Sequence, residues 1–262
     1  GQLDAQVRTE LYTVTKNNGT RRTGILFKQE DSNLAPTIYL EEFYQKYLKG
    51  QQVPDLADSI CSIYQEIRVK KTCDCQNLFD FNHVKEHIVY KLIRRDANEE
   101  LLKKIPYEPF LDLAVVYYIQ IDNTRFGSAA IQIRNEHLRY WRVEKEEIRR
   151  LAEKNTPRIY PVQIRQIVRF MYVATNEQCS LGAAVMRYPD FREKVRGMIR
   201  GDFYILPSSI HEVILVPESF GLEPERMQEM VKEINQTGVA PEEVLSDSVY
   251  YFDGEEIRIV AK

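Results

Sequence analysis

The sequence predicts an α+β fold in which antiparallel sheets are built from hairpins and helices pack on those sheets. Two observations support this class. Asn-Gly and Asp-Gly dipeptides lie between alternating, β-branched segments, and stretches with apolar residues at helical spacing separate the hairpins. The pattern lacks regular β-α-β-α crossovers, which argues against a doubly wound nucleotide-binding fold.

The chain begins with a predicted hairpin. Residues 6–16 alternate and are rich in Val, Thr and Tyr, Asn18-Gly19 supplies a two-residue turn, and residues 23–29 form the returning strand.

Three helices are expected next, over residues 35–50, 54–68 and 82–104. Apolar side chains at helical spacing are expected to face the core, namely Leu40, Phe43, Tyr44, Tyr47, Leu56, Ile60, Ile63, Tyr64, Ile67, Val84, Ile88, Leu92 and Ile93. Pro106 and Pro109 then mark a change of character. The chain is therefore expected to form either two lobes, 1–105 and 106–262, or one continuous domain.

Two later regions have similar patterns. Residues 111–121 are a near-continuous apolar run, typical of a strand covered on both faces; a turn, a second strand (128–133) and a helix (135–155, broken near Trp141) follow. Residues 170–200 predict the same order, with a second strand at 183–188. An ancient internal strand-strand-helix duplication explains the similarity, and so does the coincidence of two ordinary hairpins.

The C-terminal part predicts strands at 203–206 and 213–216, a helix at 223–236 and a hairpin around Asp253-Gly254. The segment between the first two strands holds Ser208, Ser209, His211 and Glu212, which are the residue types of a hydrolase triad. Neighbouring residues of a strand point to opposite faces, and the glycines of a nucleophile elbow are absent. We therefore favour a turn between strands, with a hydrolase-type enzyme as the alternative.

Asn155 and Arg158 surround Pro157. We expect Asn155 to end the helix, because proline disfavours helical conformation in the residue before it. Arg158 has the chemistry to reach a carboxylate or another anion. In the enzyme alternative, folding draws these two residues, with Asn135 and His137, towards the 207–212 segment.

A metal site is the second alternative. Cys73, Cys75, His83 and His87 read C-x-C-x7-H-x3-H, and a helix over 82–93 would place both histidines on one face. The cysteine spacing is wrong for a zinc finger, so a loop followed by a polar helix face is the competing interpretation. The phosphate-binding motifs G-x-G-x-x-G and G-x-x-x-x-G-K-[ST] are absent, and we expect no cofactor.

Charge and composition exclude further classes. The chain has 262 residues, 44% hydrophobic and 29% charged, with a net charge of −3. A mildly acidic chain has no overall attraction for nucleic acid, and the arginines and lysines of 139–169 interleave with glutamates. No apolar run is long enough to span a bilayer, and four scattered cysteines favour a reducing cytoplasm.

Several segments together resemble a known family: SNLAPTIYLEEFY, PFLDLAVVYY, LAEKNTPRIYP, DFYILPSSIHEVILVP and VAPEEVLSDSVYYF. The chain resembles an uncharacterised bacterial domain-of-unknown-function family, number fifty-six eighty-eight, typical of gut clostridia. The resemblance implies an intracellular bacterial protein whose relatives often begin with one more helix. It implies no activity, cofactor or site residue.

The sequence therefore favours a cytoplasmic, non-catalytic protein that binds a macromolecular partner, either another protein or a second copy of itself. No cluster of residues combines the right chemical types with plausible mutual geometry. A hydrolase near 207–212 and a metal-binding module at His83 and His87 remain the alternatives.

Overall fold

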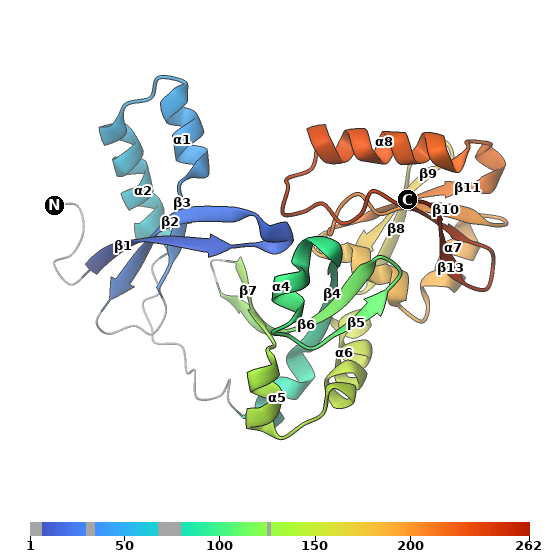
Figure 1. Cartoon of the computed structure of the whole chain (residues 1–262), viewed down its shortest axis with the longest axis horizontal. Helices are drawn as coiled ribbons and strands as arrows, with labels where there is room; N and C mark the ends of the chain where they lie inside the picture. Colours follow the sequence, from blue (N-terminus) through green and yellow to red (C-terminus); the bar gives the residue numbers. More distant parts are fainter. Residues whose placement is uncertain (1–6, 30–34, 68–79, 125–126) are drawn as a thin grey trace. The chain divides into compact units, whose positions relative to one another are not determined.

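The computed structural model describes residues 7–29, 35–67, 80–124 and 127–262 (Figure 1). Contacts divide the chain into two compact units, Gly1–Leu78 and Phe79–Lys262. The composition change suggests a boundary near residue 105, but the strand Ile88–Arg94 hydrogen-bonds to a later strand and so belongs to the second unit. Antiparallel sheets combined with helices confirm the α+β class.

The first unit contains a three-stranded antiparallel sheet in the order β1-β2-β3. β1 (Val7–Thr15) and β2 (Arg21–Gln29) form the hairpin that the Asn-Gly dipeptide predicts. They are joined through η1 (Asn17–Gly19), a short 3-10 helix in which Asn18 has a φ of 58°. Asparagine tolerates this left-handed conformation better than most residues, so the local sequence fixes the reversal. β3 (Thr37–Tyr39) pairs with β2.

Two helices, α1 (Glu41–Leu48) and α2 (Val53–Ile67), pack against this sheet. Side chains from both layers form one small core: Phe27, Ile38, Phe43, Leu56, Ile60 and Tyr64. The rings of Phe27 and Tyr64 stack with centroids 4.3 Å apart, which joins the sheet to the second helix.

The helix predicted over 35–50 is shorter than expected. It begins only at Glu41, because residues 37–39 pair with β2 as a strand. Tyr44, Tyr47 and Ile63 are exposed, whereas helical spacing predicted that they face the core. An eight-residue helix above a three-stranded sheet has little facing surface, so Phe43 is its one fully buried side chain.

The second unit contains two antiparallel sheets. In the four-stranded sheet, β6 (Leu113–Thr124) pairs with β4 (Ile88–Arg94), β5 (Tyr107–Phe110) and β7 (Gly127–Gln132). Helices and 3-10 helices adjoin this sheet in the sequence: α3 (Phe81–Val84), η3 (Lys85–His87), η4 (Asp96–Asn98), α4 (Glu99–Leu102), α5 (Asn135–Trp141) and α6 (Lys145–Ile159). The strand predicted over 111–121 is confirmed as the central strand of this sheet.

The helix predicted over 82–104 is wrong. Residues 88–94 form β4, and only short helical turns lie on either side of it. The segment IVYKLIR is rich in β-branched and aromatic residues, and five of its seven residues are buried. Pairing with β6 along its whole length therefore outweighs the helical spacing of its apolar residues.

The predicted break near Trp141 is confirmed, since α5 ends there and Arg142 has a left-handed φ of 57°. The predicted end at Asn155 is wrong, because α6 continues through Pro157 to Ile159. Proline removes one backbone hydrogen bond from the helix. The Asn155 and Thr156 side chains hold this last turn against the start of β4 (Asn155 Nδ2 to Ile88 O, 3.0 Å; Tyr90 N to Thr156 Oγ1, 3.0 Å).

The second sheet has six strands in the order β13-β12-β10-β11-β9-β8. Their bounds are β8 (Val162–Val168), β9 (Met171–Asn176), β10 (Phe203–Leu206), β11 (Val213–Pro217), β12 (Val249–Phe252) and β13 (Ile257–Ala261). The intervening helical segments are η5 (Gly182–Arg187), α7 (Phe191–Met198), η6 (Glu218–Phe220) and α8 (Pro224–Thr237). Within the described residues, no helix is both long enough and apolar enough to cross a membrane.

The strand predicted at 183–188 is wrong, because these residues lie in η5 and form no ladder. Gly182 begins this 3-10 helix, and its N–H donates to the carbonyl of His211 at 2.9 Å. The second copy of the proposed repeat therefore lacks its second strand, and the duplication is unconfirmed. The terminal hairpin is confirmed, with Gly254 at a φ of 93° in its turn.

Candidate functional site

The segment joining β10 and β11 holds the four residues that the hydrolase alternative requires. The structure ties it to a neighbouring segment by backbone hydrogen bonds, including Leu245 N to Ser208 O at 3.0 Å and Ile210 N to Glu243 O at 2.9 Å. Ser209 Oγ accepts a hydrogen bond from the backbone N–H of His211 at 3.1 Å. This serine therefore satisfies a local amide, as turn serines commonly do.

The imidazole of His211 has other partners. Nδ1 accepts from the backbone N–H of Leu181 at 3.2 Å, and Nε2 lies 3.4 Å from a carboxylate oxygen of Glu243. An accepting Nδ1 places the proton of the neutral ring on Nε2, facing Glu243. In the part of the chain that the structure describes, no hydrogen bond joins this ring to Ser208 or Ser209. Glu212 is half-buried, and within the described residues no hydrogen bond or ion pair joins its carboxylate to the ring of His211.

The other candidates of the enzyme alternative make their hydrogen bonds outside the 207–212 segment. Asn155 is buried, and its Nδ2 donates to the carbonyls of Lys85 and Ile88. Asn135 Nδ2 donates to Lys103 O at 3.4 Å, and His137 Nδ1 accepts from the N–H of Arg134 at 3.2 Å. Burial, aided by the charge of Arg134, lowers the pKa of His137.

A cavity of about 400 Å³ brings together two residues that the sequence placed in different alternatives. His87 and Arg158 both line it, with Glu86, Gln120 and Ile159. Arg158 donates to the carbonyl of Glu86 at 2.9 Å. His83 is exposed and lies in α3, whereas His87 lies in η3, so the two histidines do not share one continuous α-helix.

Metal ligation has little support in the described residues, which contain no group of three or more His, Cys, Asp or Glu side chains able to hold an ion. Cys73 and Cys75 lie outside the described residues, so the cysteine half of the predicted motif stays a prediction.

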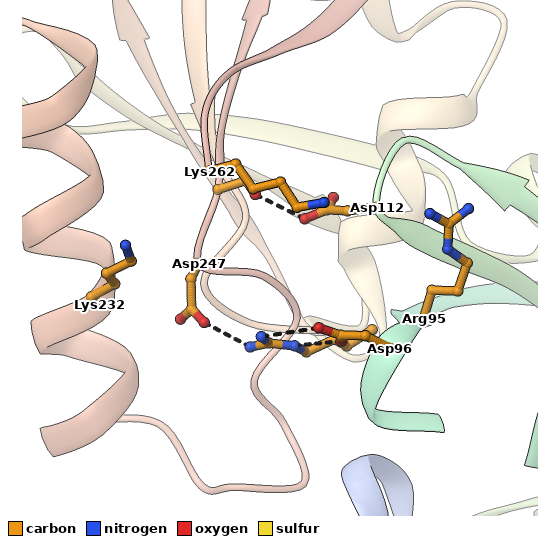
Figure 2. Close-up of a pocket in the computed structure, with 8 residues that line it drawn as sticks. Arg95, Asp96, Asp112, Lys232, Asp247 and Lys262 are labelled. Carbon is orange, nitrogen blue, oxygen red and sulfur yellow. Dashed lines mark hydrogen bonds and ion pairs between the residues drawn. The ribbon is translucent and has the colours of Figure 1, made fainter. Parts of the chain in front are cut away.

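A different cluster was not predicted. Figure 2 shows a second cavity, of about 260 Å³, in the second unit. Its lining comes from the end of β4 and the start of η4, the β5–β6 turn, α8, the segment before β12 and the residue after β13: Arg94, Arg95, Asp96, Asp112, Lys232, Asp247, Ser248 and Lys262. Segments from both sheets therefore meet at this site.

Asp112 is the centre of a hydrogen-bond network beside this cavity. Ser246 and Ser248 donate to its Oδ2 at 2.7 and 2.8 Å, and the phenol of Tyr250 donates to its Oδ1. All three hydroxyl-bearing residues are at least 98% buried. Burial, together with the charge of Asp112 and its hydrogen bond, raises the pKa of Tyr250 well above the usual value. The phenol therefore stays a donor.

Arg94 joins two carboxylates on opposite sides. Its Nε and Nη2 donate to Asp96, and its Nη1 donates to Asp247 Oδ2 at 2.8 Å (Figure 2). Asn235 donates to the other oxygen of Asp247, also at 2.8 Å. The hydrogen bond to Asp96 is the largest influence on Arg94, whose pKa is raised. Burial alone would raise the pKa of Asp247, but Asn235 and Arg94 outweigh it, and the pKa is lowered.

This geometry predicts a dependence of stability on pH. A carboxyl whose pKa is lower in the folded protein than its ordinary 3.8 binds protons more readily after unfolding. The contribution of Asp247 is therefore complete above about pH 4 and is lost as the pH falls through the folded-state pKa. We expect the free energy of unfolding, measured with urea, to fall between about pH 6 and about pH 3. This fall should be smaller for Asp247→Asn than for the unchanged protein. Equal losses in both proteins would contradict this assignment.

The first unit exposes an unusual amount of apolar surface. Seven large apolar side chains are exposed among its described residues: Leu11, Tyr12, Tyr44, Tyr47, Leu48, Val53 and Ile63. Leu11 is the most exposed, at 76%, and lies on the edge strand β1. Single apolar residues on a surface need no explanation, whereas a contiguous apolar patch commonly belongs to an interaction site.

Comparison with known proteins gives a family and no function. A family model described as a family of unknown function, DUF5688, matches residues 1–171 and 168–254. Neither the curated proteins nor the solved structures contain a match to the chain.

Proposed function

Because the chain belongs to DUF5688, a family of unknown function, its role has to be argued from geometry, and we propose a non-catalytic protein that binds a second copy of itself. The edge strand β1 of the first unit carries the contact. We also place the protein in a reducing cytoplasm, which the free thiols of Cys61 and Cys179 support.

β1 has the properties of a strand that accepts another strand. It is nine residues long and pairs with β2 in a continuous register from Val7↔Gln29 to Thr15↔Arg21. Its other edge has no strand partner among the described residues. Natural proteins protect such edges with bulges, proline, short length or charged side chains. β1 has no bulge and no proline and is nine residues long, and its only charged residues are Arg8 and Glu10.

The sequence of β1 is complementary to itself. An antiparallel pair of β1 strands centred on Leu11 sets Leu11 opposite Leu11 of the second copy, Thr9 opposite Thr13 and Glu10 opposite Tyr12. No like charges face each other in this register, so it avoids the repulsion that destabilises cross-strand pairs.

The same register extends an apolar row across both copies. Leu11 lies opposite Ile25 within one chain, so the joined sheets would hold Ile25, Leu11 and their two counterparts in line. Burying the exposed leucine from each copy contributes about 1–2 kcal/mol. Strand pairing alone gives a small interface, and we expect a reversible dimer of modest affinity.

Charge substitution at position 11 tests both the contact and its register. We expect sedimentation velocity to show dimers for the unchanged protein and monomers for Leu11→Lys and Leu11→Glu, because each variant faces its own charge. An equimolar mixture of the two variants should associate again, since opposite charges then meet. Leu48→Lys, a matched change of an exposed leucine on α1, should leave the dimer intact.

Two results would overturn the proposal. One is an unchanged protein that stays monomeric at every concentration. The other is a dimer that Leu11→Lys leaves intact, because the contact would then lie elsewhere. Failure of the mixed variants to associate would remove the register centred on Leu11.

A further inference from the structure

We infer that the cavity between Arg95, Lys232 and Lys262 is a binding site for a phosphate group. This site lies wholly within the second unit and is independent of the dimer contact on β1.

The carboxylates around the cavity already have partners. Both oxygens of Asp112 accept hydroxyl hydrogen bonds, and both oxygens of Asp96 accept from Arg94. Asp247 accepts from Arg94 on one oxygen and from Asn235 on the other. Every oxygen of these three carboxylates therefore accepts at least one hydrogen bond, and Arg94 is held between two of the carboxylates.

The remaining cations have no such partners. No side-chain hydrogen bond or ion pair involves Arg95, Lys232 or Lys262 within the described parts of the chain, although Lys232 contributes to lowering the pKa of Asp247. The three cations thus present N–H donors without a hydrogen-bonding partner, whereas each carboxylate oxygen already has at least one donor. Such an imbalance favours a ligand that brings acceptor oxygens with negative charge. The side chains of the lining carry a formal charge of +1, from four cations and three carboxylates, which is compatible with an anion.

The positions of the three cations favour a tetrahedral group. Lys232 projects from α8 on one side of the cavity, Arg95 lies on the opposite side, and Lys262 extends between them (Figure 2). A planar carboxylate takes its hydrogen bonds mainly in one plane, whereas phosphate oxygens accept from several directions.

The base of the site is held by hydrogen bonds. Ser248 is 2% exposed and donates to Asp112, and the backbone N–H of Arg95 donates to the carbonyl of Asp112 at 3.3 Å. The backbone that carries Arg95 is therefore tied to the β5–β6 turn, although the side chains of all three cations are exposed. A backbone that is held before the ligand arrives reduces the entropic cost of binding.

Titration calorimetry with inorganic phosphate at low ionic strength tests the inference on the whole chain. We expect saturable binding to one site, weakened about tenfold by Arg95→Gln or Lys232→Gln, since each change removes a charged hydrogen-bond donor. Arg139→Gln removes the same charge from an exposed site on α5 outside the cavity and should leave the affinity unchanged. Acetate should bind more weakly than phosphate.

Absence of saturable phosphate binding would overturn the inference. An equal loss of affinity in Arg139→Gln and Arg95→Gln would also overturn it, because binding would then follow net charge alone. Thermal unfolding of each variant without phosphate shows whether it is folded. If one of these variants does not fold, Lys262→Gln takes its place. The Lys262 side chain makes no hydrogen bond within the described structure, so this change should not affect folding.

Discussion

Replacing Gly182 by alanine is expected to lower the free energy of unfolding by at least about 3 kcal/mol, near the upper end for overpacking in a core. A Cβ at this position would lie 2.1 Å from Thr175 Oγ1, 2.5 Å from His211 O and 2.8 Å from Asn176 N. Two of these atoms are backbone atoms, so rotation of a side chain cannot relieve the clash. The N–H of Gly182 also donates to the His211 carbonyl, which holds the two segments together.

Gly197 provides the matched control, because it lies in α7 and a Cβ there meets no atom within 4 Å. Gly197→Ala should be neutral or stabilise the protein by up to about 1 kcal/mol, as alanine favours a helix over glycine. Urea unfolding followed by circular dichroism measures both variants. Similar stabilities for the two alanine variants would show that the junction at Gly182 tolerates a side chain.

Gly182 also shows why part of the fold was beyond prediction. The residues after it, AAVMR, are apolar enough for a strand, and their pattern predicts one. The close approach of Thr175, Asn176 and His211 decides the outcome, and those contacts come from other segments. For residues 88–94 the difference is the reverse: the apolar spacing predicts a helix, and the structure has a strand. Pairing with β6 outweighs the helical spacing there.

The hairpins are easier to predict than the segments 88–94 and 183–188, because the residues of the turn themselves determine where the chain reverses. Asn18-Gly19 and Asp253-Gly254 sit at backbone conformations that those residue types adopt readily, so the dipeptides alone locate the reversals. Central strands such as 113–119 are also recognisable, since every residue in that run is buried and apolar.

The candidate residues were harder to predict than the strands. The segment 207–212 concentrates reactive residue types, but the contacts of His211 are made with Leu181 and Glu243, which are distant in sequence. The cluster around Asp112 has one local sign, the spacing of Ser246, Ser248 and Tyr250 at every second residue. In an extended chain this spacing puts three hydroxyls on one side. Only the tertiary fold shows that an aspartate from the β5–β6 turn receives them.

Asp112→Ala is expected to be the most destabilising of the changes around the cavity, by roughly 3–5 kcal/mol. The substitution removes the acceptor of three buried hydroxyls and leaves each without its charged partner. An unsatisfied buried hydroxyl costs about 1–3 kcal/mol, and some of this cost is recovered if water enters the vacated space. Because the network joins the four-stranded sheet to the segment that leads into β12, the loss should affect the whole second unit.

Tyr250→Phe removes only one of the three hydrogen bonds to Asp112, so it shows how much of the destabilisation by Asp112→Ala comes from a single hydrogen bond. The phenylalanine ring fills the same space and removes a donor together with its need for a partner, so we expect a cost of only about 1–2 kcal/mol. Urea unfolding of both variants at about pH 7 gives the comparison. A cost for Asp112→Ala no larger than that for Tyr250→Phe would contradict the network, because the two serines would then be satisfied without the carboxylate. A cost at least twice as large would mean that one aspartate, placed by a turn, holds the two sheets of the unit together through all three hydroxyls.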